Sequence, residues 1–385
     1  MKKEILFIIP DLKIGGGAGR VVASLTSHLS EKYKISILSF LYFKEQYSFK
    51  AKYYCLKENI GSRKKILKIL KLNEILRPIR IYKYIKSISP DIIVSFMDHS
   101  NINAILSKII FRFKIPLIVT TRCNPKIAYK NKKEFRHLNF LIKILFPLKS
   151  VDKIIAVSKE IEDILRADYN IDETKLITIY NGIDYEEIKK LANRKINRYK
   201  EIFYNEDIIK FITVGRLSEE KGYDDLIEIF YNVKTQISNS KLIIIGEGPF
   251  RKKIERIIDK KFLNNDVILL GLQRNPYKYM INSDIFLFSS KYEGFPNVLI
   301  EALACKLPII STNCETGPME ILEKGRYGFL VEVQDYDDFK DRIIQLAKDQ
   351  ELMNTYSDLS FKRAKFFDLK IIINKWMSVI DRYLN

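Results

Sequence analysis

Short runs of aliphatic residues alternate along the chain with longer stretches in which apolar residues recur every three or four positions. The short runs predict buried strands, and the longer stretches predict amphipathic helices. This alternation is typical of parallel sheets that helices cover on both faces. The predicted strands are Ile5–Ile9, Ile35–Phe40, Ile92–Phe96, Leu117–Thr121 and Lys153–Val157 in the first half, and Lys210–Val214, Lys241–Ile245, Val267–Leu270, Ile285–Ser289 and Pro308–Thr312 in the second.

Each set of five strands is enough for one doubly wound sheet, so the predicted fold is α/β with two Rossmann-like domains in tandem. Residues 184–207 lie between the two sets and are rich in charge without a strand signal, which predicts a linker and a helix. The last segment, Leu369–Leu384, is amphipathic and holds the only tryptophan, Trp376. The predicted domains are therefore residues 1–185 and 186–365, followed by a terminal helix in residues 366–385.

The composition excludes several classes of protein. A chain of 385 residues with 47% hydrophobic positions is long and apolar enough for two ordinary folded domains, which excludes a disordered protein. Its 4 cysteines stand far apart without a CxxC pair, so neither a disulfide framework nor a zinc site is expected. The apolar run Ile5–Ile9 stops at Pro10 and is too short for a signal peptide, and no uncharged run is long enough to span a membrane. A soluble, cytoplasmic protein is the prediction.

The positive charge is concentrated in the first half of the chain. Of the net charge of +19, residues 1–180 carry +18, from 34 basic and 16 acidic side chains. The densest stretch, Gly61–Ile88, combines an apolar stripe at helical spacing with surrounding lysines and arginines. A basic amphipathic helix of this kind suits an anionic membrane surface, although a surface helix packed on its own domain has the same pattern. Nucleic acid is a rival partner for so basic a half.

A glycine-rich segment, Gly15–Arg20, follows the first predicted strand and precedes a helix predicted over Val21–Ser30. Its backbone can approach a phosphate closely, but tight turns use the same residues. The spacing is not that of the dinucleotide-binding GxGxxG, and no acidic residue closes the second strand near Phe40. A nicotinamide-dependent enzyme is therefore disfavoured.

Two cations follow the first strand of the second half. Arg216 and Lys221 stand five residues apart at the carboxyl end of a predicted strand, where open α/β sheets bind ligands. A guanidinium and an ammonium together suit a diphosphate. A solvated loop with Ser218 as the N-cap of a helix is the alternative interpretation.

The segment from Glu293 to Glu301 follows another apolar strand and opens an apolar helix. Glu301 lies just over one turn inside that helix, where a buried carboxylate is costly unless hydroxyl groups or cations pair with it. Carboxylates that accept hydrogen bonds from neighbouring hydroxyls indicate a sugar ligand. The backbone N–H groups of Asn297 and Val298 at the helix start can hold phosphate.

These residues, with Ile179–Asp184 and Ile245–Pro249, resemble the family-4 glycosyltransferases of the GT-B architecture over essentially the whole chain. The resemblance implies two Rossmann-like domains that face each other across a cleft and a C-terminal helix that returns to the first domain. It also implies transfer from a UDP-sugar with retention of the anomeric configuration. No cofactor and no metal are then expected, because cations of the protein neutralise the leaving diphosphate.

The resemblance implies a role for each matching residue. Arg216 and Lys221 neutralise the diphosphate, and Glu301 holds the ribose hydroxyls. The Glu293 carboxylate contacts the donor sugar, with the backbone of Gly294 and Phe295 beside it. Gly16 and Gly17 lie near the phosphates.

The sequence departs from the family pattern in two places. Gly19 replaces the glutamate usual in the glycine-rich loop, which we expect to make the loop more flexible. Arg122, followed two residues later by Asn124, stands where many members have a histidine, and arginine cannot act as a base at neutral pH. Asp98 and His99 are further candidates to line the acceptor site.

The triplet Asp335-Tyr336-Asp337 mimics the DxD metal motif of other transferases. It precedes an amphipathic helix, so N-capping by Asp335 or Asp337 is the preferred interpretation.

The leading hypothesis is a retaining glycosyltransferase that moves a hexose or N-acetylhexosamine from a UDP-sugar to a lipid-diphosphate-linked saccharide in cell-surface polysaccharide synthesis. The basic first domain would dock on the inner face of the membrane. A UDP-sugar epimerase or hydrolase of similar fold would show no dependence on an acceptor. A nucleic-acid-binding protein is the third hypothesis, but the aromatic residues stand mostly in apolar runs and no recognised binding motif is present, so we expect no nucleic-acid partner.

Overall fold

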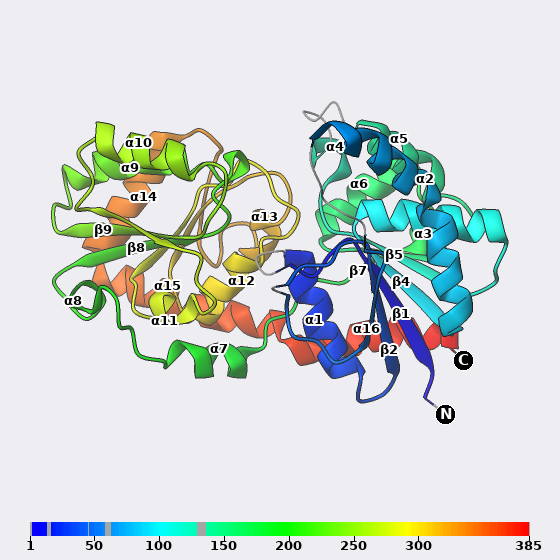
Figure 1. Ribbon diagram of the computed structural model, residues 1–385. Coiled ribbons are helices and arrows are strands. Elements are labelled where there is room, and N and C mark those ends of the chain that lie inside the picture. The colour runs from blue at the N-terminus through cyan, green and yellow to red at the C-terminus, as the bar shows by residue number, and fades with distance from the viewer. Residues whose placement is uncertain (1, 14–16, 45, 58–62, 129–135, 385) are drawn as a thin grey trace. The chain divides into compact units, whose positions relative to one another are not determined.

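The protein is described by a computed structural model covering residues 2–13, 17–44, 46–57, 63–128 and 136–384, with residues 63–74 and Arg136 described by their backbone (Figure 1). The chain divides into two compact units. Unit 1 comprises Met1–Asn181 together with Ile372–Asn385, and unit 2 comprises Gly182–Ile371.

Unit 1 is built on a parallel sheet in the order β3-β2-β1-β4-β5-β6-β7. Its central strands β1, β4 and β5 are buried along their whole length and consist mainly of aliphatic residues, as a parallel sheet covered on both faces favours. Ile5 on β1 pairs with Ile35 on one side and with Ile92 on the other. The strands are β1 (Glu4–Ile9), β2 (Lys34–Ser39), β3 (Lys52–Cys55), β4 (Ile92–Phe96), β5 (Leu117–Thr121), β6 (Lys153–Ala156) and β7 (Leu176–Thr178).

The helices of unit 1 cover both faces of this sheet (Figure 1). Right-handed crossovers put α2, α3 and α5 on one face, where α3 packs against the other two, and α1 on the opposite face. The terminal helix α16 packs on this unit at two points. Asp381 accepts hydrogen bonds from Lys32 and Tyr33, which lie between α1 and β2, and Trp376 stacks on Phe96 of β4 at 5.7 Å. The helices are α1 (Gly17–Leu29), α2 (Arg63–Ile88), α3 (Asp98–Phe111), α4 (Pro125–Ala128), α5 (Arg136–Leu145), α6 (Lys159–Tyr169) and α16 (Leu369–Leu384), with a 3-10 turn at Glu173–Lys175.

Unit 2 is built on a second parallel sheet, in the order β10-β9-β8-β11-β12-β13. The strands are β8 (Ile209–Val214), β9 (Ser240–Ile245), β10 (Val267–Gly271), β11 (Ile285–Phe288), β12 (Ile309–Thr312) and β13 (Phe329–Val331). The helices are α7 (Tyr185–Ala192), α8 (Lys200–Phe203), α9 (Tyr223–Lys234), α10 (Arg251–Lys260), α11 (Tyr277–Met280), α12 (Asn297–Ala304), α13 (Pro318–Ile321), α14 (Tyr336–Lys348) and α15 (Gln350–Ala364), with 3-10 turns at Glu219–Lys221 and Lys365–Phe367.

These two sheets confirm the predicted fold class, and all ten predicted strands are present. Three further strands, β3, β7 and β13, were not predicted. Each is only three or four residues long and lies at an edge of its sheet. Strands this short cannot carry the longer apolar runs from which the other strands were predicted.

The glycine-rich segment differs from the prediction. The helix α1 begins at Gly17 instead of Val21, so Gly19 lies inside the first turn of a helix and not in a flexible loop. A Cβ atom at Gly19 would lie 3.2 Å from the Cα atom of Leu12. The absence of a side chain at Gly19 therefore allows the start of α1 to pack closely on the segment that follows β1. Gly16 lies outside the described residues.

No helix in the part of the chain that the structure describes is long and apolar enough to cross a membrane.

Candidate active site

The candidate donor residues gather at the topological switch point of unit 2. The order of strands reverses between β8 and β11, and open α/β sheets bind ligands outside the carboxyl ends of the strands at such a point. Arg216 and Lys221 lie on the segment that follows β8, and Glu293 lies on the segment that follows β11. The structure therefore brings together two motifs that are far apart in the sequence.

An ion pair joins these motifs directly. The Lys221 ammonium donates a hydrogen bond to Glu293 Oε1, with an Nζ–Oε1 distance of 2.5 Å. Both side chains are largely buried, with exposed fractions of 19% and 14%. The Arg216 side chain is exposed and forms no ion pair with another described residue. A charged ligand that enters this site would therefore find one exposed cation and one cation already paired with a carboxylate.

The backbone next to Lys221 is held in place by contacts with the segment that follows β11. The Ser289 hydroxyl donates a hydrogen bond of 2.9 Å to the carbonyl oxygen of Lys221. Gly222 has φ +62°, and a Cβ atom there would lie 2.2 Å from the carbonyl oxygen of Ser289. Only glycine fits this close approach without a shift of the backbone. The position of the ammonium therefore depends on the contact between the two segments.

The helix α12 begins directly after the loop that carries Glu293. Gly294 and Phe295 are buried in this loop, and the Phe295 ring packs edge-on against Phe367 at 5.8 Å. Asn297 and Val298 are the first two residues of α12 and are half-buried. The first N–H groups of an α-helix have no acceptor within the helix, so this end favours an anion.

Glu301 lies on α12, one turn beyond the start of the helix, with an exposed fraction of only 4%. Burial, together with the nearby negative charge of Glu301, raises the pKa of the Cys305 thiol one turn later. Glu301 is therefore buried, as predicted, and its negative charge disfavours the thiolate form of Cys305.

Thr316 supports the Glu293 loop and was not recognised as a candidate from the sequence. Its buried hydroxyl donates a hydrogen bond to the carbonyl oxygen of Glu293. The backbone N–H of Glu293 donates in turn to the carbonyl oxygen of Glu315 at 3.2 Å. These two bonds fix the loop against the segment after β12. No spacing in the sequence pairs residues 293 and 316, so only the folded chain reveals this support.

The candidate acceptor residues lie at the carboxyl ends of β4 and β5 in unit 1, next to the switch point between β1 and β4. Asp98 and His99 begin α3, immediately after β4, and Arg122 and Asn124 follow the neighbouring strand β5. The Cys123 thiol donates a long hydrogen bond of 3.8 Å to Asp98 Oδ2, which joins the two segments. Gly17, the other candidate in this unit, is the exposed first residue of α1.

Burial shapes the charge of two of these residues. Burial lowers the pKa of Arg122 to about 10, which still leaves the guanidinium charged near neutral pH. The guanidinium lies 5.6 Å from the centre of the Phe96 ring and donates a hydrogen bond to the Asn181 side chain. Burial, with the positive charge of Arg77 and then His137, lowers the pKa of His99 to about 4. His99 is therefore a neutral imidazole at physiological pH.

Asn124 is buried and has a local structural contact. Its side-chain oxygen accepts a hydrogen bond of 3.0 Å from the backbone N–H of Lys126, at the start of α4. The amide oxygen of Asn124 therefore stabilises the turn that leads into α4.

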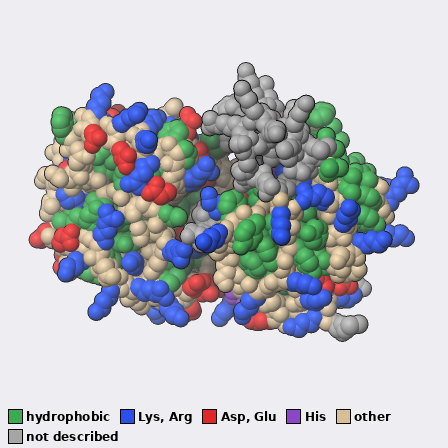
Figure 2. Space-filling model, in the orientation of Figure 1, with side chains coloured by type: hydrophobic (Ala, Val, Ile, Leu, Met, Phe, Trp, Pro, Cys, Tyr) green, Lys and Arg blue, Asp and Glu red, His purple; other side chains and the backbone are tan. Residues whose placement is uncertain are grey.

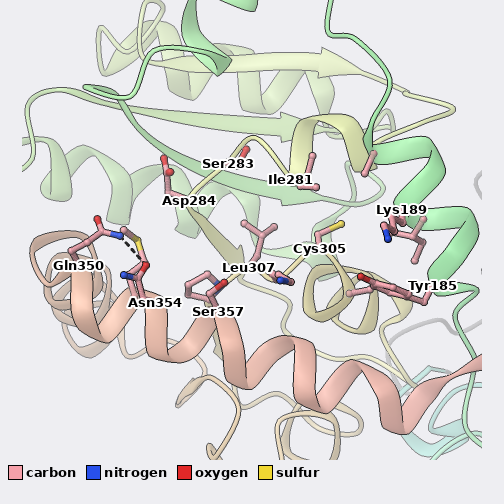
Figure 3. Close-up of a pocket in the computed structure, with 16 residues that line it drawn as sticks. Tyr185, Lys189, Ile281, Ser283, Asp284, Cys305, Leu307, Gln350, Asn354 and Ser357 are labelled. Carbon is pink, nitrogen blue, oxygen red and sulfur yellow. Dashed lines mark hydrogen bonds between the residues drawn. The ribbon is translucent and has the colours of Figure 1, made fainter.

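A hollow of about 320 Å³ lies at the other end of the strands of the unit 2 sheet (Figure 3). Ser283 and Asp284, which line it, directly precede β11, and Leu307, which also lines it, lies just before β12. The hollow is thus at the amino ends of these strands, whereas Lys221 and Glu293 follow the carboxyl ends. None of the candidate site residues lines it.

The acidic triplet Asp335–Asp337 caps a helix, as predicted. The Asp335 carboxylate accepts a hydrogen bond of 3.1 Å from the backbone N–H of Asp338, in the first turn of α14. Among the residues that the structure describes, no three His, Cys, Asp or Glu side chains gather as a metal site requires. Independence of metal stays a prediction.

Comparison with known proteins identifies the family. Residues 15–187 match the model described as Glycosyltransferase Family 4, and residues 194–363 match that described as Glycosyl transferases group 1. The chain is 33% identical over 343 residues to an uncharacterized glycosyltransferase of Methanocaldococcus jannaschii, covering 79% of this chain and 82% of that protein.

A second relative comes from Campylobacter jejuni. It is named N-acetylgalactosamine-N,N'-diacetylbacillosaminyl-diphospho-undecaprenol 4-alpha-N-acetylgalactosaminyltransferase, and it is 32% identical over 357 residues, covering 92% of this chain and 93% of the relative. Among solved structures, Anabaena HepE in complex with UDP-glucose shares the fold, with a TM-score of 0.73 at 18% identity, covering 98% of this chain and 99% of HepE. The chain therefore belongs to glycosyltransferase family 4, with two Rossmann-like domains of the GT-B type.

Proposed function

We propose that this glycosyltransferase transfers a hexose or N-acetylhexosamine from a UDP-sugar to a lipid-diphosphate-linked saccharide, with retention of configuration, in the synthesis of a cell-surface polysaccharide. The observation that carries the donor half of the proposal is the contact between Lys221 and Glu293 at the switch point of unit 2. It puts a cation for a diphosphate and a carboxylate for a sugar hydroxyl in one place. The complex of Anabaena HepE with UDP-glucose supports the choice of nucleotide.

The chemistry assigned to the donor residues follows from the charge that develops. Departure of UDP leaves negative charge on the diphosphate, so Lys221 and Arg216 stabilise the transition state more than the ground state. The start of α12 at Asn297 and Val298 offers backbone N–H groups to the same charge. Binding of the diphosphate by Lys221 would release Glu293 to accept hydrogen bonds from the sugar. Glu301 is assigned to the ribose hydroxyls.

The proposed reaction uses attack on the same face of the sugar from which UDP departs. The leaving phosphate takes the proton of the acceptor hydroxyl, so the proposal needs no second carboxylate as the acid partner of a carboxylate nucleophile. Arg122 remains protonated and His99 neutral near pH 7. We assign both to the acceptor side, with Asp98 and Asn124. No metal is part of this proposal, and EDTA is expected to leave the rate unchanged.

The acceptor half of the proposal draws on the Campylobacter relative, whose name describes a diphospho-undecaprenol substrate. The positive charge of residues 1–180 suits both a diphosphate and an anionic membrane. We therefore propose that the protein works in the cytoplasm, at the inner face of the cell membrane. The side chains of residues 63–74, which include the most basic part of α2, lie outside those described.

The test is release of UDP from a panel of UDP-sugars, with and without a short polyprenyl-diphosphate saccharide. Release that rises for one sugar only when the acceptor is present is the expected result, and it names the donor. The configuration of the purified product, read by NMR, tests retention. Release that ignores the acceptor would indicate hydrolysis or epimerisation. Full activity of a Glu293→Ala variant would show that the assigned site is wrong.

A further inference from the structure

Three neighbouring helices of unit 1 expose an unusual number of large apolar side chains. Eight of the eighteen large hydrophobic residues that are exposed in the described part of the protein lie on α2, on α3 or in the segment 137–148 that includes α5. Figure 2 shows hydrophobic side chains gathered in this region, beside the atoms drawn in grey. The eight exposed residues are called the α2–α3–α5 surface below, and they are Ile75, Leu76, Ile79, Ile109, Ile110, Phe140, Ile144 and Leu148.

The spacing of these residues indicates an organised face. Phe140 and Ile144 stand four positions apart on one face of α5, and Ile75 and Ile79 do the same on α2. Leu148 lies in the turn that follows α5. Phe140 and Ile75 have exposed fractions of 64% and 72%, so neither is part of the core. Since α3 packs against both α2 and α5, the two pairs lie on the two helices that contact α3.

Exposed cations stand among these apolar side chains. These cations form no ion pair with any described residue. The three segments 75–88, 98–114 and 137–150 hold one described acidic side chain, that of Asp98, and it is buried. The surface therefore combines exposed apolar chains with uncompensated positive charge. The exposed cations are Lys83, Lys86, Arg112, Lys114, Lys143 and Lys149.

We propose that the α2–α3–α5 surface docks on an anionic phospholipid bilayer. Its apolar side chains would enter the boundary between headgroups and acyl chains, and its lysines and arginines would lie on the lipid phosphates. This inference rests on the proposed function in one respect, because a lipid-linked acceptor explains why the enzyme meets a membrane. It adds to the basic stretch of α2 a docking face formed by α3 and α5.

The charge of the surface argues against two other occupants. A second copy of the chain would bring two positive surfaces together, and like charges that face each other oppose association. Nucleic acid would bind the cations through its phosphates, but its backbone would leave the isoleucine and phenylalanine side chains on the same helices exposed to water. An anionic bilayer satisfies both kinds of side chain at once.

The experiment is co-sedimentation of the full-length protein with vesicles of phosphatidylcholine, alone or with about 30% phosphatidylglycerol. We expect binding to the anionic vesicles only. We expect binding to be at least 10-fold weaker in each of two double variants. Lys143→Glu/Lys149→Glu removes two lysines, each of which contributes about fivefold near the surface. Phe140→Ser/Ile144→Ser removes apolar area that would enter the bilayer. Matched controls in unit 2 are Phe262→Ser, which removes a side chain that is 90% exposed, and Lys252→Glu, both expected to bind as the wild type does.

Activity separates this inference from the proposed function. Both double variants should keep wild-type transfer to a water-soluble, short-chain acceptor and lose it only with an acceptor embedded in vesicles. A protein that binds anionic vesicles through this surface but transfers no sugar to any acceptor would refute the proposed function and leave the docking surface standing. Wild-type vesicle binding by both double variants, with melting temperatures unchanged, would overturn the inference.

Two further outcomes would also overturn it. A concentration-dependent dimer in light scattering that the Phe140→Ser/Ile144→Ser variant abolishes would assign the surface to a second copy. Retention on duplex DNA that depends on Lys143 and Lys149 but not on Phe140, without vesicle binding, would assign it to nucleic acid.

Discussion

Removal of the Lys221 ammonium should affect transfer far more than folding. In the Lys221→Met variant the alkyl chain remains, while the Glu293 carboxylate loses its partner at 2.5 Å. Because both side chains are mostly but not fully buried, we expect the free energy of unfolding to fall by about 1–3 kcal/mol, between the values for exposed and buried pairs. Loss of a cation that stabilises the leaving diphosphate should lower kcat by about 100- to 1,000-fold.

A second ion pair of unit 2 supplies a matched control. Lys234 Nζ lies 3.0 Å from Asp266 Oδ1, with exposed fractions of 19% and 21%, nearly the same as for the pair in the site. Lys234 is the last residue of α9, whereas Lys221 lies just before the first residue of this helix. The control pair is therefore a full helix length away from the site. Asp266 keeps a second partner, because Lys241 Nζ lies 2.9 Å from the same carboxylate oxygen. The Lys234→Met variant should therefore lose less stability than Lys221→Met and should keep its transfer activity and its affinity for UDP.

The assay has three readouts: urea unfolding, titration of UDP by calorimetry, and UDP release with donor and acceptor. Lys221→Met should weaken UDP binding by about 10- to 100-fold, as expected for a lost hydrogen bond to a charged group. The double variant Lys221→Met/Glu293→Gln should recover part of the lost stability, since the unpaired carboxylate is gone, without recovering activity. Wild-type kcat in Lys221→Met, or an equal loss of kcat in Lys234→Met, would refute the reasoning.

Four further predictions concern packing, backbone geometry, the Thr316 hydroxyl and pH. Trp376→Ala should lower the free energy of unfolding by about 3–5 kcal/mol in denaturant titrations, because the indole is fully buried. Gly222→Ala should lower the melting temperature and weaken UDP binding, whereas Gly325→Ala, whose Cβ would meet only an atom 3.8 Å away, should show the cost of its positive φ alone. Thr316→Val should lower kcat while Thr316→Ser retains it, and equal losses in both would contradict a role for the hydroxyl. His99, with a pKa lowered to about 4, binds its proton more weakly in the folded state than in the unfolded state, so its contribution to stability is present above about pH 6.5 and is lost as the pH falls toward 4. The loss should be on the order of 3 kcal/mol and should be absent from His99→Gln.

Most of the fold could be predicted because its central strands carry their own signal. Runs such as Ile5–Ile9 and Ile285–Phe288 are apolar without interruption, and this pattern is typical of a strand that is buried on both faces. The edge strands β3 and β7 were missed because they are short and lack such runs. Their hydrogen bonds to the neighbouring strands, which no local pattern encodes, make them strands.

The start of α1 shows a second limit of the sequence. A run of glycines favours a turn by local preference, and this pattern predicts a helix that begins only at Val21. The structure begins the helix at Gly17, since packing of Gly19 against Leu12 outweighs that preference. Tertiary contact overrides intrinsic propensity wherever it is worth more than the propensity of a few residues.

The sequence by itself determined the alternation of strands and helices, the division into two sheets, and the identity and order of the charged residues at the strand ends. It could not determine that Lys221 and Glu293 are in contact, or that Thr316 supports the loop between β11 and α12. Those contacts exist because the order of the parallel sheet puts β8 beside β11 and β11 beside β12, so that loops far apart in the chain leave the same edge. Strand order is decided by the burial of whole helices and sheets, and it is therefore a property of the complete tertiary structure.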